Sequence, residues 1–545
     1  MPLTAPTFSS TSTLNQQRII AAIDLGTNSL HTVIVEIDPA TPSFNVIARE
    51  KATVRLGETD GRGWLTAEAM DRTIAALERA IALAESYQAE DIVAAATSAT
   101  REAPNGQAFL ERIQQQLGLE IDLISGQEEA RRIYLGVLSA VPLNGKPHVI
   151  IDIGGGSTEL ILGTGEEALF LRSVKVGAVR LNRQFLTCDP PANKEFKRLQ
   201  SYIKGMVERP TEQIGTLLTD VEPDTPIRVI GTSGTIEALA AADAHIRGEE
   251  PSNLHGYTFD TNGLRKLIDR MLNMTAVERA KIPGMNERRA EIIVAGAAIL
   301  QEVLKSLGAT EISVCEWALR EGLVVNWMLT QNLIEDRLRF QSQVRQRHVY
   351  RMAKKFQVDI PFSERVADFA TSLFDQTQLV LHQWGERERE LLWAAAILHN
   401  SGHFVSHSAH HKHSYYLIRN GELLGFSEEE IEAIANMARY HRKSSPKKKH
   451  EGFQNLPDDN YRRMVSELST FLRLATALHR RPIPAIASVN VDIDPKTKTV
   501  YLDLTPIKRN DDCSLELWAV DFKRAVFEQQ FGYRLSAHLM EKRFA

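Results

Sequence analysis

The sequence predicts an α/β protein of two similar lobes, followed by a mostly helical domain and a small α+β domain. A strand that ends in Asp-x-Gly occurs twice, in "AAIDLGTNS" at 21–29 and in "VIIDIGGGS" at 149–157, as in two copies of one unit. From 343 to about 485 the apolar residues recur every three or four positions, the spacing of amphipathic helices. Residues 487–506 alternate apolar and polar side chains, which indicates a β-hairpin.

The first lobe is expected over 18–140 and the second over 141–330. In the first lobe, two short strands flank the Asp-x-Gly turn, a helix follows at 66–88, and "DIVAAAT" at 91–97 forms a further strand. The second lobe repeats this scheme and adds another strand, turn and helix in "RVIGTSGTIEALAAA" at 228–242. Short apolar runs bounded by glycine are typical of parallel strands buried on both faces. Three strand-to-turn units therefore predict one phosphate-binding cleft between two lobes.

The rest of the chain divides at about residue 485. A helical domain is expected over 331–485, and a C-terminal α+β domain over 486–545, where the helix "AVDFKRAVFEQQFGY" follows the hairpin. Residues 1–17 are polar and lack the positive start and apolar centre of a signal peptide, so we expect a disordered leader there.

The composition limits the class of protein. At 545 residues the chain is longer than one hydrophobic core supports, and 43% apolar with 24% charged residues indicates a globular protein. No apolar run reaches the roughly 18 residues that span a bilayer, and a net charge of −5 gives no footprint for nucleic acid. The three widely spaced cysteines, Cys188, Cys315 and Cys513, predict neither a disulfide framework nor a thiolate metal site, which favours a cytoplasmic protein.

The glycine-rich turns are candidate phosphate sites. Glycine has no Cβ, so the N–H groups of Gly154 and Gly156 can approach an anion closely, and the Asp before them can hold a cation against its oxygens. For this stretch alone, a phosphate loop and a tight structural turn are equally good interpretations. Arg101, in "SATRE", adds a planar guanidinium that suits phosphate. The other candidate phosphate ligands lie in the same three turns: Thr27, Asn28, Ser29, Gly155, Ser157, Thr158, Gly231, Ser233 and Gly234.

A series of segments in the first 325 residues forms a more specific pattern than any one glycine turn. In chain order they are "AAIDLGTNSLHTVIVE", "VRLGE", "AAATSATREAPNG", "LISGQEEARRIYLGV", "IDIGGGSTELI", "SVKVGAVRL", "IGTSGT", "RRAEIIVAGAAIL" and "ALREGL". With these motifs the chain resembles the exopolyphosphatase/guanosine pentaphosphate phosphohydrolase family. The resemblance implies the two-lobed ATPase fold of actin, hexokinase and Hsp70, and hydrolysis of phosphoanhydride bonds.

The resemblance also implies roles for particular acids. Glu129, in "SGQEEARR", would be the catalytic residue that polarises the attacking water, whereas Glu128 would point elsewhere on the helix. Without the surrounding motifs, both read more simply as ordinary acids of a first helical turn. Asp24, Asp152 and Glu159 would hold Mg²⁺ (or Mn²⁺) or position the phosphate. The alternative for either Asp is a capping role where a strand meets a turn.

One segment departs from the family pattern. "SVCEW", at 313–317, stands before "ALREGL" where a sequence nearer to "SDG" is expected. Glu316 can replace the acid, but Trp317 in place of a glycine predicts a different loop shape.

The helical domain contains a histidine-rich segment, "LHNSGHFVSHSAHHKHS" at 398–414. Four of its histidines are spaced four apart: His399, His403, His407 and His411. On one helix this spacing would place four imidazoles on a single face, where they could bind a metal. Gly402 and the neighbouring serines argue against one continuous helix.

This segment better resembles an HD-type phosphohydrolase domain, in which a His-Asp pair coordinates a metal. Here the pair reads His399-Asn400, and in "LRLATALHR" Thr476 and His479 stand where acids are expected. Because an amide is a poor substitute for a bridging carboxylate, we favour a metal-free HD-like domain that acts as a scaffold or substrate channel. A second, metal-dependent active site is the alternative.

Next to it lies a basic segment, "RYHRKSSPKKKH" at 439–450. Its cationic residues are Arg439, Arg442, Lys443, Lys447, Lys448 and Lys449. Such a run is usually a solvated surface. In a chain that acts on polyanions it can instead hold a polyphosphate chain, with release of counterions.

The sequence therefore favours a cytoplasmic hydrolase that removes terminal orthophosphate from inorganic polyphosphate. Guanosine pentaphosphate is the alternative substrate. An actin-type small-molecule kinase and a non-catalytic nucleotide sensor are the alternatives from other classes. The expected partners are these phosphate substrates and, by resemblance, a second copy of the chain in a homodimer; no nucleic acid or membrane partner is expected.

Overall fold

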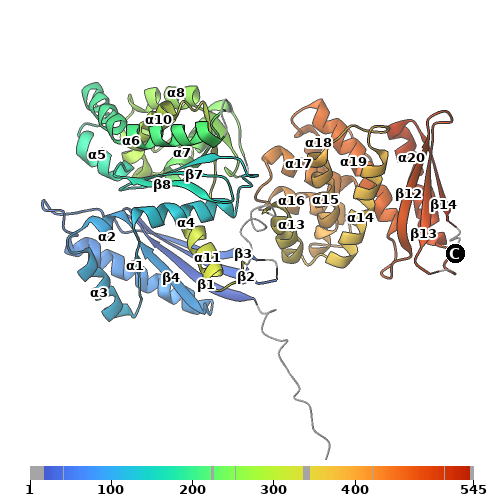
Figure 1. The fold of residues 1–545 in the computed structure, drawn as a ribbon, viewed down its shortest axis with the longest axis horizontal. Helices are drawn as coiled ribbons and strands as arrows, with labels where there is room; N and C mark the ends of the chain where they lie inside the picture. The colour runs from blue at the N-terminus through green and yellow to red at the C-terminus, as the bar shows by residue number, and fades with distance from the viewer. Residues whose placement is uncertain are drawn as a thin grey trace, which may run out of the picture. The chain divides into compact units, whose positions relative to one another are not determined.

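The computed structural model describes residues 17–40, 42–221, 226–251, 253–334, 344–421, 423–508 and 510–540. The predicted leader lies outside these residues except for Gln17. The chain forms two compact units that divide after Val344, drawn in Figure 1, and each is described by itself. Within the described ranges, no helix combines the length and the apolar character needed to cross a bilayer.

The first lobe is built on a five-stranded sheet in the order β3-β2-β1-β4-β5. Its strands are β1 (Arg18–Leu25), β2 (Ser29–Asp38), β3 (Ser43–Thr53), β4 (Asp91–Ala96) and β5 (Asp122–Leu123). β1 lies at the centre, antiparallel to β2 and parallel to β4. The helices are α1 (Ala67–Ser86), α2 (Ser98–Glu102) and α3 (Gly106–Leu117). α1 starts at Thr66, whose side chain accepts a hydrogen bond from Ala69 N, and buries its apolar stripe in the core of the lobe.

The second lobe repeats this plan in a six-stranded sheet, in the order β10-β11-β9-β6-β7-β8. Its strands are β6 (His148–Ile153), β7 (Thr158–Gly163), β8 (Ala168–Val174), β9 (Val229–Thr232), β10 (Thr258–Asp260) and β11 (Glu311–Val314). β6 corresponds to β1, because it too is antiparallel to the next strand and parallel to a later one. Asp24 and Asp152 therefore lie near the ends of equivalent central strands, which confirms the predicted duplication.

The helices of the second lobe are α5 (Ala178–Phe185), α6 (Asn193–Val221), α7 (Gly234–Arg247), α8 (Thr261–Met271), α9 (Ala276–Arg279) and α10 (Glu287–Leu307). Figure 1 shows α6, α7 and α10 gathered on one side of the sheet that contains β7 and β8. Their apolar faces share one core with that sheet.

Two helices cross between the lobes. α4 (Gly126–Leu138) leaves the first lobe and packs on β7 and β8, whereas α11 (Leu319–Thr330) leaves the second lobe and packs on β1, β2 and β4. The two helices also pack on each other. A Cβ at Gly136 would lie 2.0 Å from Ala318 O, and one at Gly322 would lie 1.8 Å from Arg132 O. Glycine is therefore required at both positions for the two backbones to meet.

The second unit joins a helical part to a small sheet. Its helices are α13 (Val344–Lys355), α14 (Ile360–Thr377), α15 (Glu386–Leu398), the short 3₁₀ helix η1 (Ser401–Phe404), α16 (His410–Arg419), α17 (Glu428–Tyr440), α18 (Glu451–Gln454), α19 (Asp459–Leu478) and α20 (Ser514–Phe531). The sheet has the order β12-β13-β14, from β12 (Ile486–Asp494), β13 (Thr499–Pro506) and β14 (Arg534–Leu539). One apolar core runs through the helices and the sheet.

The predicted hairpin is confirmed as β12 and β13, which pair antiparallel. The sequence did not predict β14, which pairs parallel to β13. The histidine-rich segment is not one helix, because α15 ends at Leu398 and α16 begins only at His410. The domain limits at 140 and 485 stay predictions.

Candidate active site

A cleft of about 670 Å³ lies in the first unit, lined by residues of both lobes. It contains both Asp-x-Gly turns, at 24–29 and 152–157. The turns touch, since a Cβ at Gly156 would lie 2.9 Å from Thr27 Oγ1 and 2.5 Å from Ser98 Oγ. Only glycine allows this approach at position 156, and a Cβ at Gly155 would also come within 3.1 Å of Thr27 Cβ.

The two turns have the same backbone geometry. Gly26 N donates to Ser29 O at 3.1 Å, and Gly154 N donates to Ser157 O at 2.9 Å. Within the described ranges we find no hydrogen bond from the N–H groups of Gly155 and Gly156. Unpaired backbone N–H groups on a cleft wall are suited to an anion.

Two neighbouring acids at the start of α4 have different surroundings. Glu129 lines the cleft with 6% of its surface exposed, and its Oε2 accepts a hydrogen bond from Arg101 Nη1 at 3.0 Å. Burial raises the pKa of Glu129 above its usual value, against the lowering effect of Arg101. Glu128 instead forms ion pairs with Arg131 and Arg132, and the Arg131 hydrogen bonds are the main cause that lowers the pKa of Glu128 to about 2. Of these two glutamates, only Glu129 is therefore placed to act on a ligand in the cleft.

The two equivalent aspartates face the same space. Burial and then the charge of Glu129 raise the pKa of Asp24 to about 7 and that of Asp152 to about 8. Asp24 Oδ1 is buried and has no hydrogen-bond partner in the described part of the chain. A carboxylate oxygen left bare in this way suits a cation that enters with a ligand.

Glu159 lies beside Asp152 in the β6–β7 ladder and is 1% exposed. Its Oε1 accepts a hydrogen bond from Ser173 Oγ at 2.7 Å, and burial raises its pKa well above the usual value. Glu159 thus lines the cleft as a buried group that Ser173 holds by a hydrogen bond.

The acids of the cleft offer oxygen donors to a divalent cation. Over the described ranges, no group of three or more His, Cys, Asp or Glu side chains is arranged to hold a metal ion. Mg²⁺, however, usually takes one or two carboxylates and completes its shell with water and substrate phosphates. Asp24 and Asp152, with the bare Oδ1 of Asp24, fit that smaller requirement.

Three of the predicted phosphate ligands lie elsewhere. The Thr158 hydroxyl donates to Val176 O at 2.5 Å, so it is used inside the lobe. Gly231 belongs to β9 and packs against Ile236 and Ile312, away from the residues that line the cleft. Arg101 reaches the cleft only through its bond to Glu129. Thr158 and Gly231 are not among the residues that line the cleft, because a motif does not tell which side of a strand faces the ligand.

The third turn does reach the cleft through Ser233 and Gly234. Ser233 has φ +85°, a conformation that costs energy for a residue with a side chain. Its hydroxyl donates to Ile153 O at 2.9 Å and so ties the third turn to the end of β6. Gly234 contacts the Arg289 guanidinium, which a Cβ would approach within 2.1 Å.

Sequence reasoning missed a group of cations on the cleft wall. These are Arg49, Lys51, Arg288, Arg289 and Arg320. The alternation of Arg49, Lys51 and Thr53 along β3 was available as a signal, because residues two apart on a strand share one face. His31, Glu237 and Asn286 line the cleft as well.

The loop that departs from the family pattern is firmly packed. Trp317 is 4% exposed and stacks on Phe44, with ring centroids 4.9 Å apart. Its carbonyl accepts a hydrogen bond from Thr232 Oγ1 at 3.1 Å. Glu316 lines the cleft and accepts from Leu254 N at 3.2 Å. An aromatic contact with β3 thus stabilises the loop where a glycine was expected.

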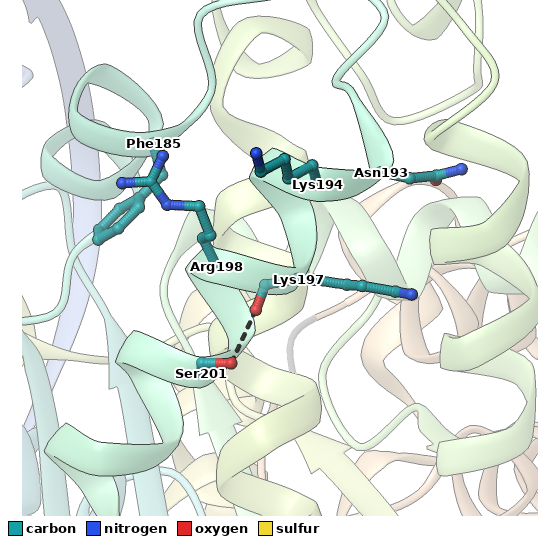
Figure 2. A pocket seen from close by; sticks show the side chains of 6 residues that line it. All are labelled: Phe185, Asn193, Lys194, Lys197, Arg198 and Ser201. Atoms are coloured by element: carbon teal, nitrogen blue, oxygen red, sulfur yellow. Dashed lines mark hydrogen bonds between the residues drawn. The ribbon is translucent and has the colours of Figure 1, made fainter.

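A second, shallower hollow of about 560 Å³ lies on α5 and α6 (Figure 2). It is lined by Phe185, Asn193, Lys194, Lys197, Arg198 and Ser201. Figure 2 shows Arg198 extended toward the Phe185 ring, while Lys197 points the other way. None of the six described lining residues is a carboxylate that could act on a water, so this hollow is not a candidate for the reaction.

In the second unit, three buried imidazoles come together from different elements. His410 Nε2 lies 3.4 Å from His441 Nε2, and the rings of His399 and His441 are 5.0 Å apart. Thr476 stands at one of the positions where an HD-type domain would have an acid. Its Oγ1 accepts a hydrogen bond from Lys523 Nζ at 2.8 Å. Burial lowers the pKa of the Lys523 amine to about 7, and the metal-free state of this part stays a prediction.

In the predicted basic segment, two arginine side chains contact other residues, whereas four lysine side chains are exposed. Arg439 lies over the Tyr415 ring at 5.2 Å, and Arg442 Nη1 lies 3.3 Å from His410 Nδ1. The side chains of Lys443 and of Lys447, Lys448 and Lys449 are exposed.

Comparison with known proteins gives consistent matches. The Ppx/GppA phosphatase family matches residues 33–331, and domain III of the Ppx/GppA phosphatases matches residues 344–524. Exopolyphosphatase 1 of Mycobacterium tuberculosis is 32% identical over 313 residues, which cover 56% of this chain and 87% of that protein. The guanosine-5'-triphosphate,3'-diphosphate pyrophosphatase of Pseudoalteromonas atlantica is 29% identical over 434 residues, 78% of this chain and 80% of that protein.

Solved structures agree with these matches. An exopolyphosphatase from Cytophaga hutchinsonii is 28% identical, with a TM-score of 0.52, over 58% of this chain and 98% of that one. The Ppx/GppA family member from Aquifex aeolicus is also 28% identical, with a TM-score of 0.50, over 58% of this chain and 99% of that one. The predicted actin-like fold is confirmed, and this chain belongs to the Ppx/GppA phosphatase family.

Proposed function

We propose that this chain is an exopolyphosphatase that hydrolyses the terminal phosphoanhydride bond of inorganic polyphosphate. The observation that carries the proposal is the buried Glu129 carboxylate, in one cleft with two glycine turns that line the same space. The relatives named exopolyphosphatase support the same reaction class.

The reaction needs a held phosphoryl group and an oriented water. The N–H groups of Gly155 and Gly156, with the hydroxyls of Thr27 and Ser157, would bind the oxygens of the terminal phosphoryl. Glu129 would accept a proton from the water as its oxygen attacks phosphorus. The bridging P–O bond breaks, and its electron pair stays with the shortened chain. A carboxyl with a raised pKa is suited to this task as a base near neutral pH.

Asp24 and Asp152 would hold Mg²⁺ or Mn²⁺, in agreement with their oxygen donors and the bare Oδ1 of Asp24. The ion would supply positive charge to neutralise the phosphate oxygens. In our proposal, Arg101 holds Glu129 in place before the substrate binds and adds charge to the transferred group afterwards.

Guanosine pentaphosphate is the second candidate substrate. The favouring observation is the Pseudoalteromonas relative, whose match reaches further along the chain than that of the mycobacterial exopolyphosphatase. Both substrates end in a phosphoanhydride that the same cleft geometry can attack. An actin-type kinase would need an acceptor in place of water.

The test is a side-by-side assay of orthophosphate release from polyphosphate and from guanosine pentaphosphate, with Mg²⁺ and no other nucleotide. We expect release from polyphosphate with the higher kcat/KM. Release from guanosine pentaphosphate alone would assign the second function. Release from neither, with phosphate transfer to an added sugar or acetate, would assign a kinase.

Three further expectations belong to this proposal. The cationic residues of the basic segment, Arg439, Arg442, Lys443, Lys447, Lys448 and Lys449, would hold a long polyphosphate chain. The chain would work as a homodimer in the cytoplasm. The HD-like part of the second unit would act without a metal.

A further inference from the structure

The glycine turn at 154–157 is held from one side by the start of α5. Three backbone N–H groups of that helix donate to the carbonyls of the first two glycines: Ala178 N to Gly154 O at 3.0 Å, and Val179 N and Arg180 N to Gly155 O at 3.0 and 3.1 Å. A Cβ at Gly177, which precedes α5, would lie 2.4 Å from Gly155 O. The backbone of the turn therefore lies directly against the first residues of α5.

The third carbonyl of the glycine run is bound by a side chain. Arg180 Nε donates to Gly156 O at 2.8 Å. Because the peptide bond is planar and trans, the C=O of one residue points opposite to the N–H of the next. With all three carbonyls turned toward α5, the N–H groups of Gly155, Gly156 and Ser157 are turned to the other side. Within the described ranges, these three N–H groups have no hydrogen bond.

The Arg180 side chain is anchored by the other lobe. Its Nη2 donates to Glu102 Oε1 at 2.8 Å, and Glu102 belongs to α2 of the first lobe. Two further groups fix the Glu102 carboxylate, since Ser98 Oγ donates to Oε1 at 2.8 Å and Lys175 Nζ lies 3.3 Å from Oε2. The side chains of Arg180 and Glu102 are 33% and 23% exposed, so the pair is better shielded from water than an ordinary surface ion pair.

This anchor sets one carbonyl of the turn apart from the other two. Gly154 O and Gly155 O are bound by the backbone of their own lobe, whereas the bond to Gly156 O comes from a side chain that the first lobe holds. Neither Arg180 nor Glu102 is among the residues that line the cleft. Donors to a developing negative charge are most effective when they are fixed before the ligand arrives. Arg180 can therefore affect the site without touching the ligand.

We propose that Arg180 is a positioning residue, which turns the Ser157 N–H toward the transferred phosphoryl while Glu102 of the first lobe holds its guanidinium. Arg180 acts through the peptide between Gly156 and Ser157. The glycine turn thus has all its donors in place only when the two lobes are in contact. The inference rests on the proposed function, because it takes the glycine turn as the place where the phosphoryl binds.

The first test separates kcat from KM. A misdirected N–H loses a contact that is strongest in the transition state, so its effect belongs in kcat. Arg180→Ala should lower kcat for polyphosphate about 10²-fold, the effect of losing one such donor, and change KM by less than about three-fold. Arg180→Lys keeps a cation without the two-sided reach of a guanidinium, so it should recover to about 10-fold below wild type. A raised KM at unchanged kcat in Arg180→Ala would overturn the positioning role.

Arg183→Ala is the matched control. Arg183 also lies on α5, and its Nη2 donates to Thr59 O of the first lobe at 3.3 Å, so it joins the lobes without holding the glycine turn. It should keep kcat within about two-fold of wild type, because tethering alone is not the proposed role. A loss as large as that of Arg180→Ala would assign the effect to tethering and overturn the proposal.

Glu102→Gln tests the anchor. It keeps the size of the side chain and an oxygen for Ser98, but it removes the charge that holds Arg180. It should lower kcat about 10-fold in the wild-type background and cause no further loss in Arg180→Ala, because the two residues act as one unit. Additive losses would overturn the anchor. Glu102→Gln and Arg180→Lys carry the test if Arg180→Ala does not fold, which its melting temperature reports.

A binding measurement makes the test independent of turnover. Orthovanadate can take the five-coordinate shape of a phosphoryl under attack, whereas orthophosphate cannot. By calorimetry with Mg²⁺, Arg180→Ala should weaken orthovanadate binding about 10-fold and orthophosphate binding less than about three-fold. Equal effects on the two anions would overturn the positioning role. Wild-type protein that shows the expected pattern but releases no orthophosphate from polyphosphate would contradict the proposed function alone.

Discussion

At the scale of single residues, the adjacent glutamates Glu128 and Glu129 differ most clearly in their surroundings. Glu129 lies buried in the cleft, whereas Glu128 is paired with Arg131 and Arg132 outside it. Glu129→Gln keeps the size of the side chain but removes the base, so kcat should fall by about 10²- to 10⁴-fold. Steady-state assays with polyphosphate check this, and binding of the substrate should change little.

Glu128→Gln is the control for this prediction. It weakens a partly buried ion-pair cluster that includes the buried Arg132, so it should cost about 1–3 kcal/mol of stability and leave kcat unchanged. Near-normal turnover in a folded Glu129→Gln variant would remove Glu129 from the mechanism.

Prediction from the sequence was uneven at this scale, for a physical reason. Glu129 and the glycine turns were found because they lie inside motifs whose residue types suit phosphate chemistry. The cations on the cleft wall were not found, because an isolated Lys51 or Arg320 looks like any surface charge until the two lobes are brought together. Thr158 was assigned a ligand role, but strand alternation turns its hydroxyl toward Val176.

The crossing of α4 and α11 matters most at the scale of elements, because Glu129 lies on one helix and Arg320 on the other. Gly136→Ala would push a methyl group against Ala318 O and separate the helices. Such overpacking typically costs about 1–3 kcal/mol, and it should also lower kcat because both charged groups move. Thermal unfolding and kinetics on the same sample check both effects.

Gly205→Ala is the matched control, since Gly205 is helical and a Cβ there meets nothing within 4 Å. Alanine should stabilise α6 by about 0.5–1 kcal/mol at that position. A Gly136→Ala variant as stable and active as Gly205→Ala would show that the crossing tolerates separation.

The buried histidines of the second unit predict a pH dependence. Burial lowers the pKa of His399 to about 4 and that of His410 to about 3, and it lowers the pKa of His441 well below its usual value. An unfolded histidine takes up a proton below about pH 6.5, whereas these folded histidines stay neutral, so acid favours the unfolded state. Each contributes up to about 1.4 kcal/mol of lost stability per pH unit below that point.

The melting temperature of the second unit should therefore fall steadily as the pH is lowered from about 7 to about 5. In His441→Gln the free energy of unfolding should fall less steeply with decreasing pH, because the contribution of one buried histidine is removed. The comparison is made after correction for any change in stability at neutral pH. An unchanged melting temperature over this range would mean that the imidazoles are already charged in the folded state. The sequence analysis pointed to the histidine-rich segment that contains His399 and His410, but not to its grouping with His441, because His441 comes from the end of α17.

At the scale of the whole molecule, the open question is whether the second unit binds the same polyphosphate chain as the cleft. Lys447, Lys448 and Lys449 are exposed, and their replacement by Gln removes at most three phosphate contacts. KM for long chains should rise and its salt dependence become shallower, while KM for tripolyphosphate stays unchanged. The measurement is KM against chain length at two salt concentrations.

A triple Gln variant at Lys496, Lys498 and Lys508 is the control, because these lysines are exposed and belong to the turn between β12 and β13 and to the segment after β13, outside the basic segment. Equal effects on short and long chains would place the basic segment at the cleft. No effect on either would leave it as a solvated surface.

The sequence predicted the organisation of the whole chain better than it predicted single elements or site residues. Repetition of one strand-and-turn unit identified the two lobes, and a change of period from two to 3.6 identified the helical part. β14 was not predicted, because a short strand after a helix has too few residues to show alternation. The packing of α4 and α11 on the opposite lobe also depends on contacts far apart in sequence, which local patterning does not contain.

The central claim is that water, oriented by Glu129, attacks the terminal phosphorus of polyphosphate. It is tested most directly by hydrolysis in water labelled with heavy oxygen, with Mg²⁺ and no nucleotide, sugar or acetate present. Mass spectrometry of the products should find one heavy oxygen in each released orthophosphate and none in the shortened chain. Heavy oxygen at the end of the shortened chain, or no release without an acceptor, would contradict the account.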